Sequence, residues 1–565
     1  MTPTKIAERV SLSVEQCVSI STPAPGVVLL DFGRVAFGNL ELTVSGDAGN
    51  VTVHFGEAFS GGRINRQPPG SVRYSVATVS LVRDSAQVVA PAPDERNTGA
   101  AAVHLPPEWG VVLPFRWVEI EGLPAGVRLT AVHRRSAFAR TWDDGASSFQ
   151  SSDEMLNRIW ELCRYSIKAT TFAGVYVDGD RERIPYEADA YLNQLSHYAV
   201  DPDFQMARDT FDYLMRSPTW PTEWASHMVF MAHADWMQTG DTDWLRARYE
   251  SLKSKLLLER VRPDGLITGT PEQVKKDIVD WPPAERDGYV FLPVNTVVNA
   301  FYLRAIALMA EMARALGKDA EAATFETRFS TGGAVFQRAL FNPASGLYRD
   351  GEGAEHSSFH ANLFPLAFGL VPARYRAGVV AFLEGKGMAC SVYPVQYLLE
   401  GLFENGAADH ALALMTAAGD RSWRHMVESG TTITWEAWDQ RYKPNQDWNH
   451  AWGAAPANIL PRFVTGVQPL APGWKRVSIR PFPGSLTWCI GKVPTALGPV
   501  HVQWRRGKTF ELTFELPAGA VGFLELPVTG KGVVWIDGQR VEAIRAGDRL
   551  KVAGEWSGRH QVEIS

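Results

Sequence analysis

The sequence predicts a multidomain chain in which an all-α (α/α)6 barrel is flanked by an N-terminal and a C-terminal antiparallel β-sandwich domain. Three observations support this fold class. Both ends contain short runs of alternating apolar and polar residues broken by Gly, Pro and Asp, and the centre contains consecutive helical segments without strand signals. The pattern changes at two places, so we predict domains at 1–142, 143–466 and 467–565.

The N-terminal segment is rich in β-branched and aromatic residues. Runs such as 27–46 and 51–59 alternate apolar and polar positions, and the Pro- and Ala-rich stretch 88–110 is expected to be a loop. These features predict strands that pair in an antiparallel β-sandwich.

The central segment begins with a helix-start signal. Ser151 and Glu154 form a capping-box pattern, and apolar residues then recur at helical spacing. Twelve candidate helices follow one another, which predicts six hairpins closed in a ring; an α-solenoid is the alternative, but the sequence has no fixed internal period. The long insertions 262–294 and 420–448 are expected to lie at the cleft end of the ring. The candidate helices are 153–170, 187–200, 204–217, 221–240, 241–261, 295–317, 320–340, 358–370, 373–387, 391–406, 408–419 and 449–466.

Alternation of apolar and polar residues returns from about residue 467. Asp537 and Gly538 give a hairpin signal between two such runs. The segment is therefore expected to form the second antiparallel β-sandwich.

Composition excludes several classes of protein. The 565 residues are 45% hydrophobic and carry a formal charge of -6 with no basic stripe, so nucleic acid is not an expected partner. There is no uninterrupted apolar run of about 18 residues and no signal-like N-terminus, so we expect no membrane contact and a cytoplasmic location. The four cysteines form no CxxC pair, so neither a disulfide framework nor a structural zinc is expected. The oligomeric state is not fixed, and a homodimer is left open.

Two carboxylate-rich stretches carry the expected chemistry. Residues 176–193 place five carboxylates and two arginines among aromatic and apolar residues, where partial desolvation shifts pKa values. Far downstream, Glu436 stands close to Trp435 and Trp438. Glycoside hydrolysis needs one carboxylic acid to protonate the leaving oxygen and a second carboxylate on the opposite face. We therefore expect the two stretches to meet in one cleft and hydrolyse a sugar bond, although flanking arginines leave the protonation of Glu182 open.

A family resemblance rests on three motifs. DGDRERIPYEAD resembles the acidic signature of the inverting α-L-rhamnosidases, TTITWEAWD resembles their Thr-Thr-x-Trp-Glu segment, and WNHAWGAAPANILPRFVTGV resembles the helix that follows. LDFGRVAFGNLELTVSG is also similar to the family's N-terminal β-domain. The resemblance implies hydrolysis of a terminal, non-reducing α-L-rhamnose from small glycosides or oligosaccharides with inversion, without metal or other cofactor.

The resemblance also implies roles for individual residues. Glu182 is expected to be the general acid and Glu436 the general base. One residue is missing between Asp178 and Glu182, so Asp178 or Asp180, and Arg181 or Arg183, fill the sugar-binding positions, and Tyr186 stands where the family usually has Trp. The implied substrate-binding residues are Asp178, Arg181, Tyr186, Asp189, Trp281, Trp438 and His450.

Other interpretations stay open at this stage. Glu182 fits a structural ion-pair network, Trp281 and His450 fit a packed core, and Glu223 and Glu285 are competing carboxylates, with Glu285 the main rival base. A different (α/α)6 glycosidase, such as a uronic acid hydrolase, and an inactive sugar-binding protein on the same scaffold are the alternative functions.

Overall fold

The computed structural model describes residues 1–46 and 49–565. The chain forms two compact units, each assembled from three separate stretches. The first unit contains both acidic stretches that the sequence singles out. It comprises Met1–Trp142, Leu162–Asp189 and Met426–Ala454, and the second comprises Asp143–Glu161, Ala190–His425 and Ala455–Ser565.

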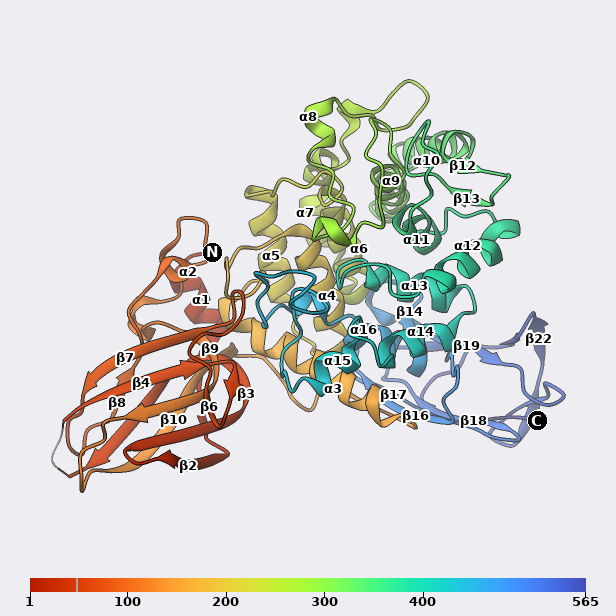
Figure 1. Ribbon diagram of the computed structural model, residues 1–565. Helices are drawn as coiled ribbons and strands as arrows, with labels where there is room; N and C mark the ends of the chain where they lie inside the picture. The colour runs from red at the N-terminus through yellow and green to blue at the C-terminus, as the bar shows by residue number, and fades with distance from the viewer. Residues whose placement is uncertain (47–48) are drawn as a thin grey trace. The chain divides into compact units, whose positions relative to one another are not determined.

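Eight strands of the first unit form one antiparallel sheet, whose main path runs β1-β10-β3-β9-β4-β7 (Figure 1). The short helix α1 (Pro3–Arg9) precedes them. The strands are β1 (Val10–Gln16), β2 (Ser19–Ala24), β3 (Val27–Ser45), β4 (Asn50–Gly56), β7 (Tyr74–Ser80), β8 (Gln87–Val89), β9 (Leu113–Glu121) and β10 (Arg128–Ala139).

Strand β3 organises this sheet because it changes partners along its 19 residues. Residues 27–31 pair with β2 and β9, residues 36–38 pair again with β9, and residues 38–45 pair with β10 and in part with β8. The register with β9 shifts between Asp31 and Ala36, which is the kind of irregularity that bends a strand. One strand therefore serves two differently paired parts of the sheet.

Two large apolar cores and a smaller cluster of Val35, Tyr165, Ala169 and Ile433 lie in the described part of the first unit. In one, Phe115 packs edge-on against Phe32 and Phe55, with ring centroids 5.9 and 5.2 Å apart. In the other, Phe37 of β3 stacks on Phe172, with centroids 3.7 Å apart and an interplanar angle of 5°. The second core thus fixes the chain just before residue 176 directly on the N-terminal sheet.

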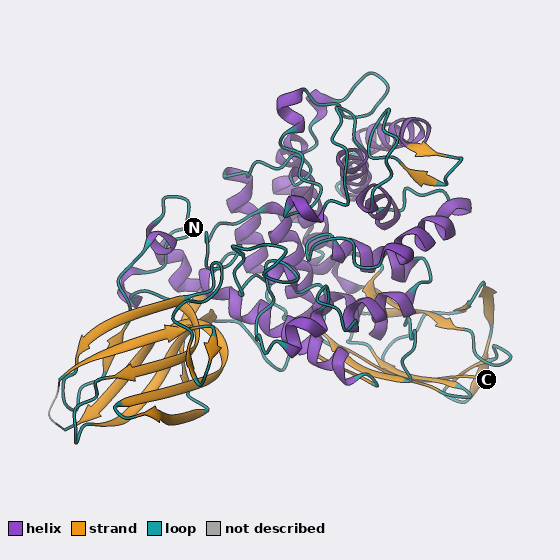
Figure 2. Cartoon of the chain, viewed as in Figure 1, coloured by secondary structure: helices purple, strands orange, loops and turns teal. Residues whose placement is uncertain are grey.

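Helices dominate the centre of the chain (Figure 2). Most begin and end within a few residues of the predicted bounds, which confirms those predictions. The helices from α3 onward are α3 (Glu154–Ala169), α4 (Glu187–Val200), α5 (Gln205–Arg216), α6 (Ala225–Thr239), α7 (Thr242–Leu252), α8 (Pro271–Val274), α9 (Thr296–Ala315), α10 (Asp319–Leu340), α11 (Phe359–Ala367), α12 (Ala373–Lys386), α13 (Val395–Glu404), α14 (Ala408–Thr416), α15 (Trp423–Glu428) and α16 (Pro456–Ile459).

Three helix predictions differ from the structure. The helix expected at 241–261 ends early, because Leu257 adopts a left-handed backbone with φ 51°. The helix expected at 449–466 is broken into a 3-10 turn, α16 and a π-helical segment at Leu460–Thr465, since Pro456 and Pro461 lack a donor N–H. Helix α15 lies in the stretch expected to be an insertion.

Alternate helices of the second unit pack on one another. Helix α9 contacts α6 and α11, and α11 contacts α13, while each of these four also packs on a sequence neighbour. These neighbours are α5, α10, α12 and α14. Helix α9 is long and apolar enough to cross a membrane, with mean hydropathy 1.3, but 83% of that stretch is buried inside the protein, as in a core helix.

The C-terminal region contains a seven-stranded and a five-stranded sheet. β11 joins the first of these although it precedes the helices, and β15 pairs with β19 in parallel, so the expectation of a purely antiparallel domain is wrong at that pair. The strands are β11 (Ser148–Ser151), β14 (Val467–Pro469), β15 (Arg476–Ile479), β16 (Trp488–Val493), β17 (Val500–Arg506), β18 (Phe510–Glu515), β19 (Val521–Pro527), β20 (Val534–Ile536), β21 (Gln539–Val541), β22 (Ala543–Ala546), β23 (Arg549–Val552) and β24 (Arg559–Ile564).

Phe115→Ala is expected to destabilise the first unit by about 3–5 kcal/mol, because it leaves a cavity between two packed rings. Urea denaturation followed by circular dichroism measures this loss. Val76→Ala, at a side chain that is 46% exposed, is the control and should change stability by less than about 0.5 kcal/mol. A Phe115→Ala variant as stable as this control would contradict the packing analysis.

Candidate active site

The loop at residues 178–183 is anchored by a buried cluster of opposite charges around Asp180. This fully buried carboxylate accepts hydrogen bonds from Arg73 Nε at 2.7 Å, from Arg96 Nη1 at 3.0 Å and from Arg183 Nη2 at 2.6 Å. Burial alone would raise the pKa of Asp180, but the three guanidinium groups hold it well below its usual range. Asp180 and Arg183 are therefore engaged in structure, which separates them from their neighbours Asp178 and Arg181.

Close backbone packing holds the same loop against residues 447–449. Gly179 has φ +100°, and a Cβ at this position would lie 2.6 Å from Asp447 Oδ2 and 2.9 Å from the Asn449 carbonyl. The Asn449 side chain accepts a hydrogen bond from the Asp180 amide at 2.7 Å and donates one to Glu57 at 2.9 Å. Only glycine fits here without displacing the partner segment.

One guanidinium bridges the two predicted catalytic glutamates. Arg181 donates from Nη1 to Glu182 Oε1 and from Nη2 to Glu436 Oε1, the latter at 2.7 Å. The side chain of Glu182 is 31% exposed, whereas that of Glu436 is 2% exposed. The two stretches expected to meet, about 250 residues apart in the sequence, do meet within the first unit.

Glu182 is held by groups on three sides. Tyr186 donates its hydroxyl to Glu182 Oε2 at 2.8 Å, and the carboxyl of Asp178 also hydrogen-bonds Glu182. Burial alone would raise the pKa of Glu182, but the charge of Arg181 and the Tyr186 hydroxyl lower it. Burial and the charge of Glu182 raise the pKa of Asp178 well above its usual value. Of the two carboxyls, Asp178 therefore has the higher pKa and binds a proton more strongly than Glu182.

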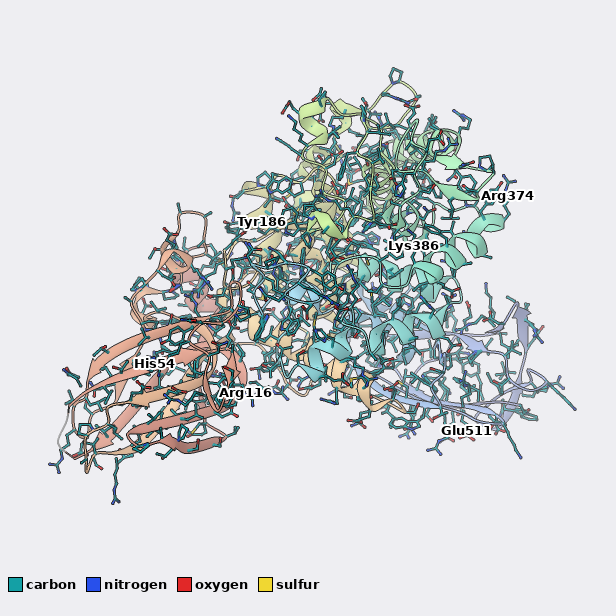
Figure 3. All side chains as sticks on the ribbon, viewed as in Figure 1. His54, Arg116, Tyr186, Arg374, Lys386 and Glu511 are labelled. Carbon is teal, nitrogen blue, oxygen red and sulfur yellow. The ribbon has the colours of Figure 1, made fainter. Side chains whose placement is uncertain are left out.

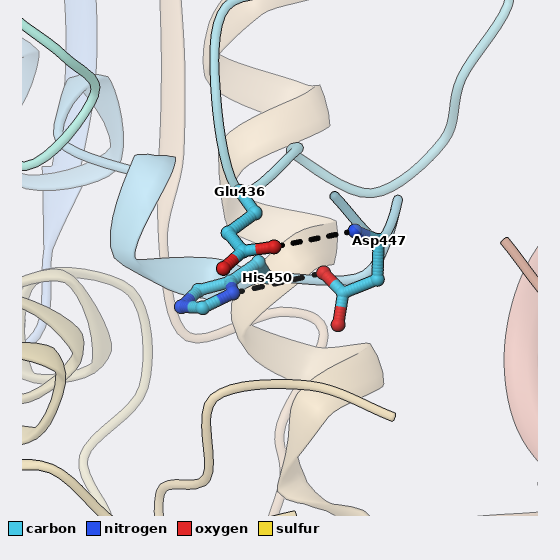
Figure 4. A group of neighbouring side chains, drawn as sticks. All are labelled: Glu436, Asp447 and His450. Atoms are coloured by element: carbon cyan, nitrogen blue, oxygen red, sulfur yellow. Dashed lines mark hydrogen bonds and ion pairs between the residues drawn. The ribbon is translucent and has the colours of Figure 1, made fainter. Parts of the chain in front are cut away.

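Glu436 lies in a cluster with Asp447 and His450, shown in Figure 4. The Asp447 amide donates to Glu436 Oε2 at 3.4 Å, and Lys443 Nζ lies 3.3 Å from Glu436 Oε1. Burial and the neighbouring charge of Asp447 raise the pKa of Glu436, against the opposing effect of the cations His450, Arg181 and Lys443. The cluster thus holds a carboxyl whose pKa is displaced toward neutrality.

His450 is buried beside two acidic side chains. Its Nε2 lies 2.7 Å from Asp189 Oδ1 and its Nδ1 lies 3.6 Å from Asp447 Oδ1. Burial alone would lower its pKa, but Asp189 and Asp447 raise it well above 6.5. The ligand atoms of Glu436, Asp447 and His450 lie within 4.8 Å of one another, as a metal site requires. The cations Arg181 and Lys443 already balance Glu436, so this donor set is a poor fit for a metal ion.

The remaining predicted residues lie elsewhere. Trp438 is completely buried in the first unit, and its predicted contact with a sugar stays a prediction. Trp281 belongs to the second unit, where it forms a cis peptide bond with Pro282, and its predicted role also stays a prediction. Glu285 is paired with Arg421, and Glu223 accepts hydrogen bonds from the Ile278 and Val279 amides, so both rival carboxylates have structural partners.

Sequence reasoning missed several residues of the site. Asp447, Lys443 and Asn449 stand in or near a quoted motif, but only the folded ladder between 434–437 and 446–450 brings them to Glu436. Glu57 lies about 390 positions from its partner Asn449, and no local pattern marks it. Tyr186, which was predicted and donates its hydroxyl to Glu182, is labelled in Figure 3.

Three family models match the chain. They describe a bacterial alpha-L-rhamnosidase concanavalin-like domain at residues 21–138, a bacterial alpha-L-rhamnosidase 6 hairpin glycosidase domain at 144–464 and a bacterial alpha-L-rhamnosidase C-terminal domain at 466–539. The central part is thus a six-hairpin glycosidase helical domain flanked by β-rich domains. Because the 144–464 match covers more than half of the chain, the protein belongs to the bacterial alpha-L-rhamnosidase family.

Similar proteins agree with this assignment. The chain is 24% identical to an alpha-L-rhamnosidase of Streptomyces avermitilis over 96% of this chain and 52% of the relative, and 24% identical to one of Alteromonas sp. over 69% and 45%. It spans about half the length of these curated relatives. Among solved structures, an alpha-L-rhamnosidase from Dictyoglumus thermophilum has TM-score 0.80 at 18% identity, covering 98% of this chain and 63% of that one. The Streptomyces avermitilis alpha-L-rhamnosidase complexed with L-rhamnose has TM-score 0.79 at 21% identity, covering 98% and 54%.

His450 is expected to stay protonated well above pH 6.5, because Asp189 and Asp447 stabilise its charged form. Asp189→Asn should lower this pKa. NMR titration of 13C-labelled histidine side chains measures it, with His450→Gln to assign the signal. His227 is the internal control: burial lowers its pKa to about 3, so it should stay neutral. Titration of His450 at or below pH 6.5 would contradict the assignment of charge.

Proposed function

We propose that the protein is a glycoside hydrolase that removes terminal, non-reducing α-L-rhamnose from small glycosides or oligosaccharides with inversion of configuration. The observation that carries the proposal is the pair of glutamates held by one guanidinium in a family of six-hairpin glycosidases. Each carboxyl lies within a hydrogen bond of the same planar group, so the two glutamates face one site. Inverting glycosidases hold theirs roughly 6.5–9.5 Å apart, with a water molecule between.

We assign Glu182 as the general acid. It is the more exposed of the two glutamates, so a leaving group can reach it. When substrate covers the carboxyl, further burial raises the pKa of Glu182 against the effect of Arg181. Asp178, whose carboxyl hydrogen-bonds Glu182, can supply a proton to Glu182, which then transfers it to the glycosidic oxygen. This order explains why the free protein keeps Glu182 ionised although the reaction needs it protonated.

We assign Glu436 as the general base. Its raised pKa makes its carboxylate a stronger base than an ordinary glutamate, while Arg181 and Lys443 favour the ionised form that removes a proton from water. The reaction then places the proton of Glu182 on the leaving oxygen and the hydroxyl of the activated water on the anomeric carbon. Glu436 takes the proton that this water releases, and no cofactor enters the balance.

Buried polar atoms without partners support a sugar subsite beside these glutamates. Among the residues that the structure describes, Asp189 Oδ2 and Arg181 Nε are buried and have no hydrogen-bond partner. Such atoms are costly unless a ligand satisfies them, and the hydroxyls of a sugar ring can do so. Asp178, Tyr186 and His450 complete the proposed subsite, while Asp180 and Arg183 are excluded from it by their structural contacts.

The finer fold predictions are part of the same proposal. The alternation of mutually packed helices α6, α9, α11 and α13 with outer partners supports an (α/α)6 barrel. The two differently paired halves of β3 support an N-terminal β-sandwich. The cytoplasmic location expected from the sequence stays a prediction, and the homodimer stays an open possibility.

Glu182→Gln and Glu436→Gln are each expected to lower kcat on p-nitrophenyl α-L-rhamnoside by about 10²–10⁴-fold. A dinitrophenyl leaving group needs little protonation, so it should restore much of the rate to Glu182→Gln and none to Glu436→Gln. Glu355→Gln, at an exposed carboxylate, is the control. Proton NMR of the first-formed sugar reports inversion. Near-normal turnover in either glutamate variant would contradict the catalytic role assigned to that glutamate. Activity only on other aryl glycosides would contradict rhamnose as the sugar that is removed.

The acid limb of kcat/KM should follow the pKa of Glu436, which lies above 4.5. Lys443→Met removes a cation 3.3 Å from this carboxyl, favours its protonated form and should move the acid limb to higher pH. Lys443→Arg keeps the charge and should leave the limb in place. Profiles measured from pH 4 to 9 test the assignment, and a shift of the limb to lower pH in Lys443→Met would exclude Glu436 as the base.

A further inference from the structure

A pocket of about 460 Å³ lies in the first unit, apart from the cluster around Glu436. Its walls come from four places: Val35 of strand β3, the segment 57–69, strand β9 and the segment 429–448. They include Trp435 and Trp448 but none of Glu436, Asp447 or His450. The volume is in the range of about 300–1,000 Å³ that is typical of small-molecule sites.

Two pairs of stacked aromatic rings line this pocket, which we call the aromatic pocket. Phe59 stacks on Trp117 with centroids 4.2 Å apart and an angle of 23°, and Trp435 stacks on Trp448 with centroids 5.4 Å apart and an angle of 22°. Phe59 is 39% exposed, which is unusual for a large apolar side chain beside a cavity. Phe59 and the Arg116 guanidinium, 4.3 Å from the ring centroid, both lie over Trp117, so exposed Phe59 offers the apolar surface on which the C–H groups of a ring can stack.

The rest of the lining combines apolar residues, such as Val35, Ala58 and Pro69, with polar ones. Ser429, Thr431, Thr432 and Asn65 contribute hydroxyl and amide groups. The charge of Arg116 is already used, because its guanidinium makes two hydrogen bonds to Asp31, at 2.8 and 3.0 Å; Arg116 is labelled in Figure 3. Glu57 accepts hydrogen bonds from the Arg73 amide at 2.7 Å and from Asn449 at 2.9 Å, and burial raises its pKa to about 8. The pocket therefore suits a neutral, hydroxylated ring rather than an ion or a purely apolar molecule.

We propose that the aromatic pocket is a second sugar-binding site, which takes a neutral rhamnosyl ring separately from the catalytic subsite. The choice of rhamnose rests on the proposed function, whereas the pocket itself rests on its lining. A glycan that carries several rhamnosyl ends would then be held at two points of one unit.

The pocket is joined to the catalytic segment through two routes. Trp435 and Trp448 directly neighbour Glu436 and Asp447 in the chain, and Asn449 links Glu57 to the Asp180 amide by two hydrogen bonds. A ring bound between the aromatic pairs fixes the segment that carries Glu436 without occupying its place. Binding there is therefore not competitive with binding at the catalytic subsite.

Equilibrium dialysis of the full chain with radiolabelled L-rhamnose counts the sites. We expect two per chain in the wild type and one in Trp117→Ala, with at least a tenfold loss of affinity at the second site. Phe59→Ala removes an exposed ring with little risk to folding and should give the same result. Trp220→Ala, at a tryptophan that is 49% exposed and does not line the pocket, is the control and should keep both sites.

The outcomes separate the two proposals. His450→Gln should remove the catalytic site and leave the aromatic pocket, so it should also bind one rhamnose. A single wild-type site that is lost in His450→Gln but kept in Trp117→Ala and Phe59→Ala overturns the aromatic pocket and leaves the proposed function standing. A single site lost in the pocket variants and kept in His450→Gln supports the pocket and counts against the catalytic subsite. If the wild type binds no rhamnose at all, rhamnose is excluded as the ligand of both the catalytic subsite and the aromatic pocket.

Discussion

The burial of Asp180 is the constraint on which the proposed active site depends. A carboxylate removed from water is stable only when cations and donors replace its hydration, and here three arginines do so. Two of them, Arg73 and Arg96, come from the N-terminal region, whereas Arg183 belongs to the same loop as Asp180. The ion cluster therefore fixes the loop at 178–183 to the N-terminal part of the first unit. This attachment also fixes the positions of the residues next to Asp180 in the loop.

Neighbouring residues of this loop consequently differ in what they do. Gly179 and Arg183 both have positive φ, of 100° and 56°, so the backbone turns sharply on either side of Asp180. The turns direct Asp180 and Arg183 into the ion cluster and leave Arg181 in contact with Glu436. The sequence could not choose between Asp178 and Asp180, or between Arg181 and Arg183, because the choice lies in backbone angles rather than in residue type.

The sequence predicted those features that depend on local patterns. Helix α4 follows from the acidic first turn and apolar spacing after Tyr186, and it begins and ends where expected. The features it missed depend on distant contacts: β11 completes a sheet whose other strands lie more than 300 residues downstream, and the parallel pair β15 and β19 needs a crossover that alternation does not reveal. In the site, Glu436 and His450 were predicted because they stand in motifs, whereas Glu57 has no local signal and becomes significant only through Asn449.

One short segment, residues 434–450, contributes side chains both to the ion pairs around Glu436 and to the aromatic pocket. This shared backbone limits how far the segment can move. Between residues 434 and 450 the chain forms a narrow ladder in which Thr434 and His450 exchange hydrogen bonds of 2.9 Å. Glu436 contacts Arg181 and Lys443, while Trp435 turns to Trp448 and the aromatic pocket. A shift of the ladder that improved one environment would disturb the other, because successive side chains share one backbone. The position of the proposed base is therefore set jointly by the ion pairs around it and by the aromatic packing of its neighbour.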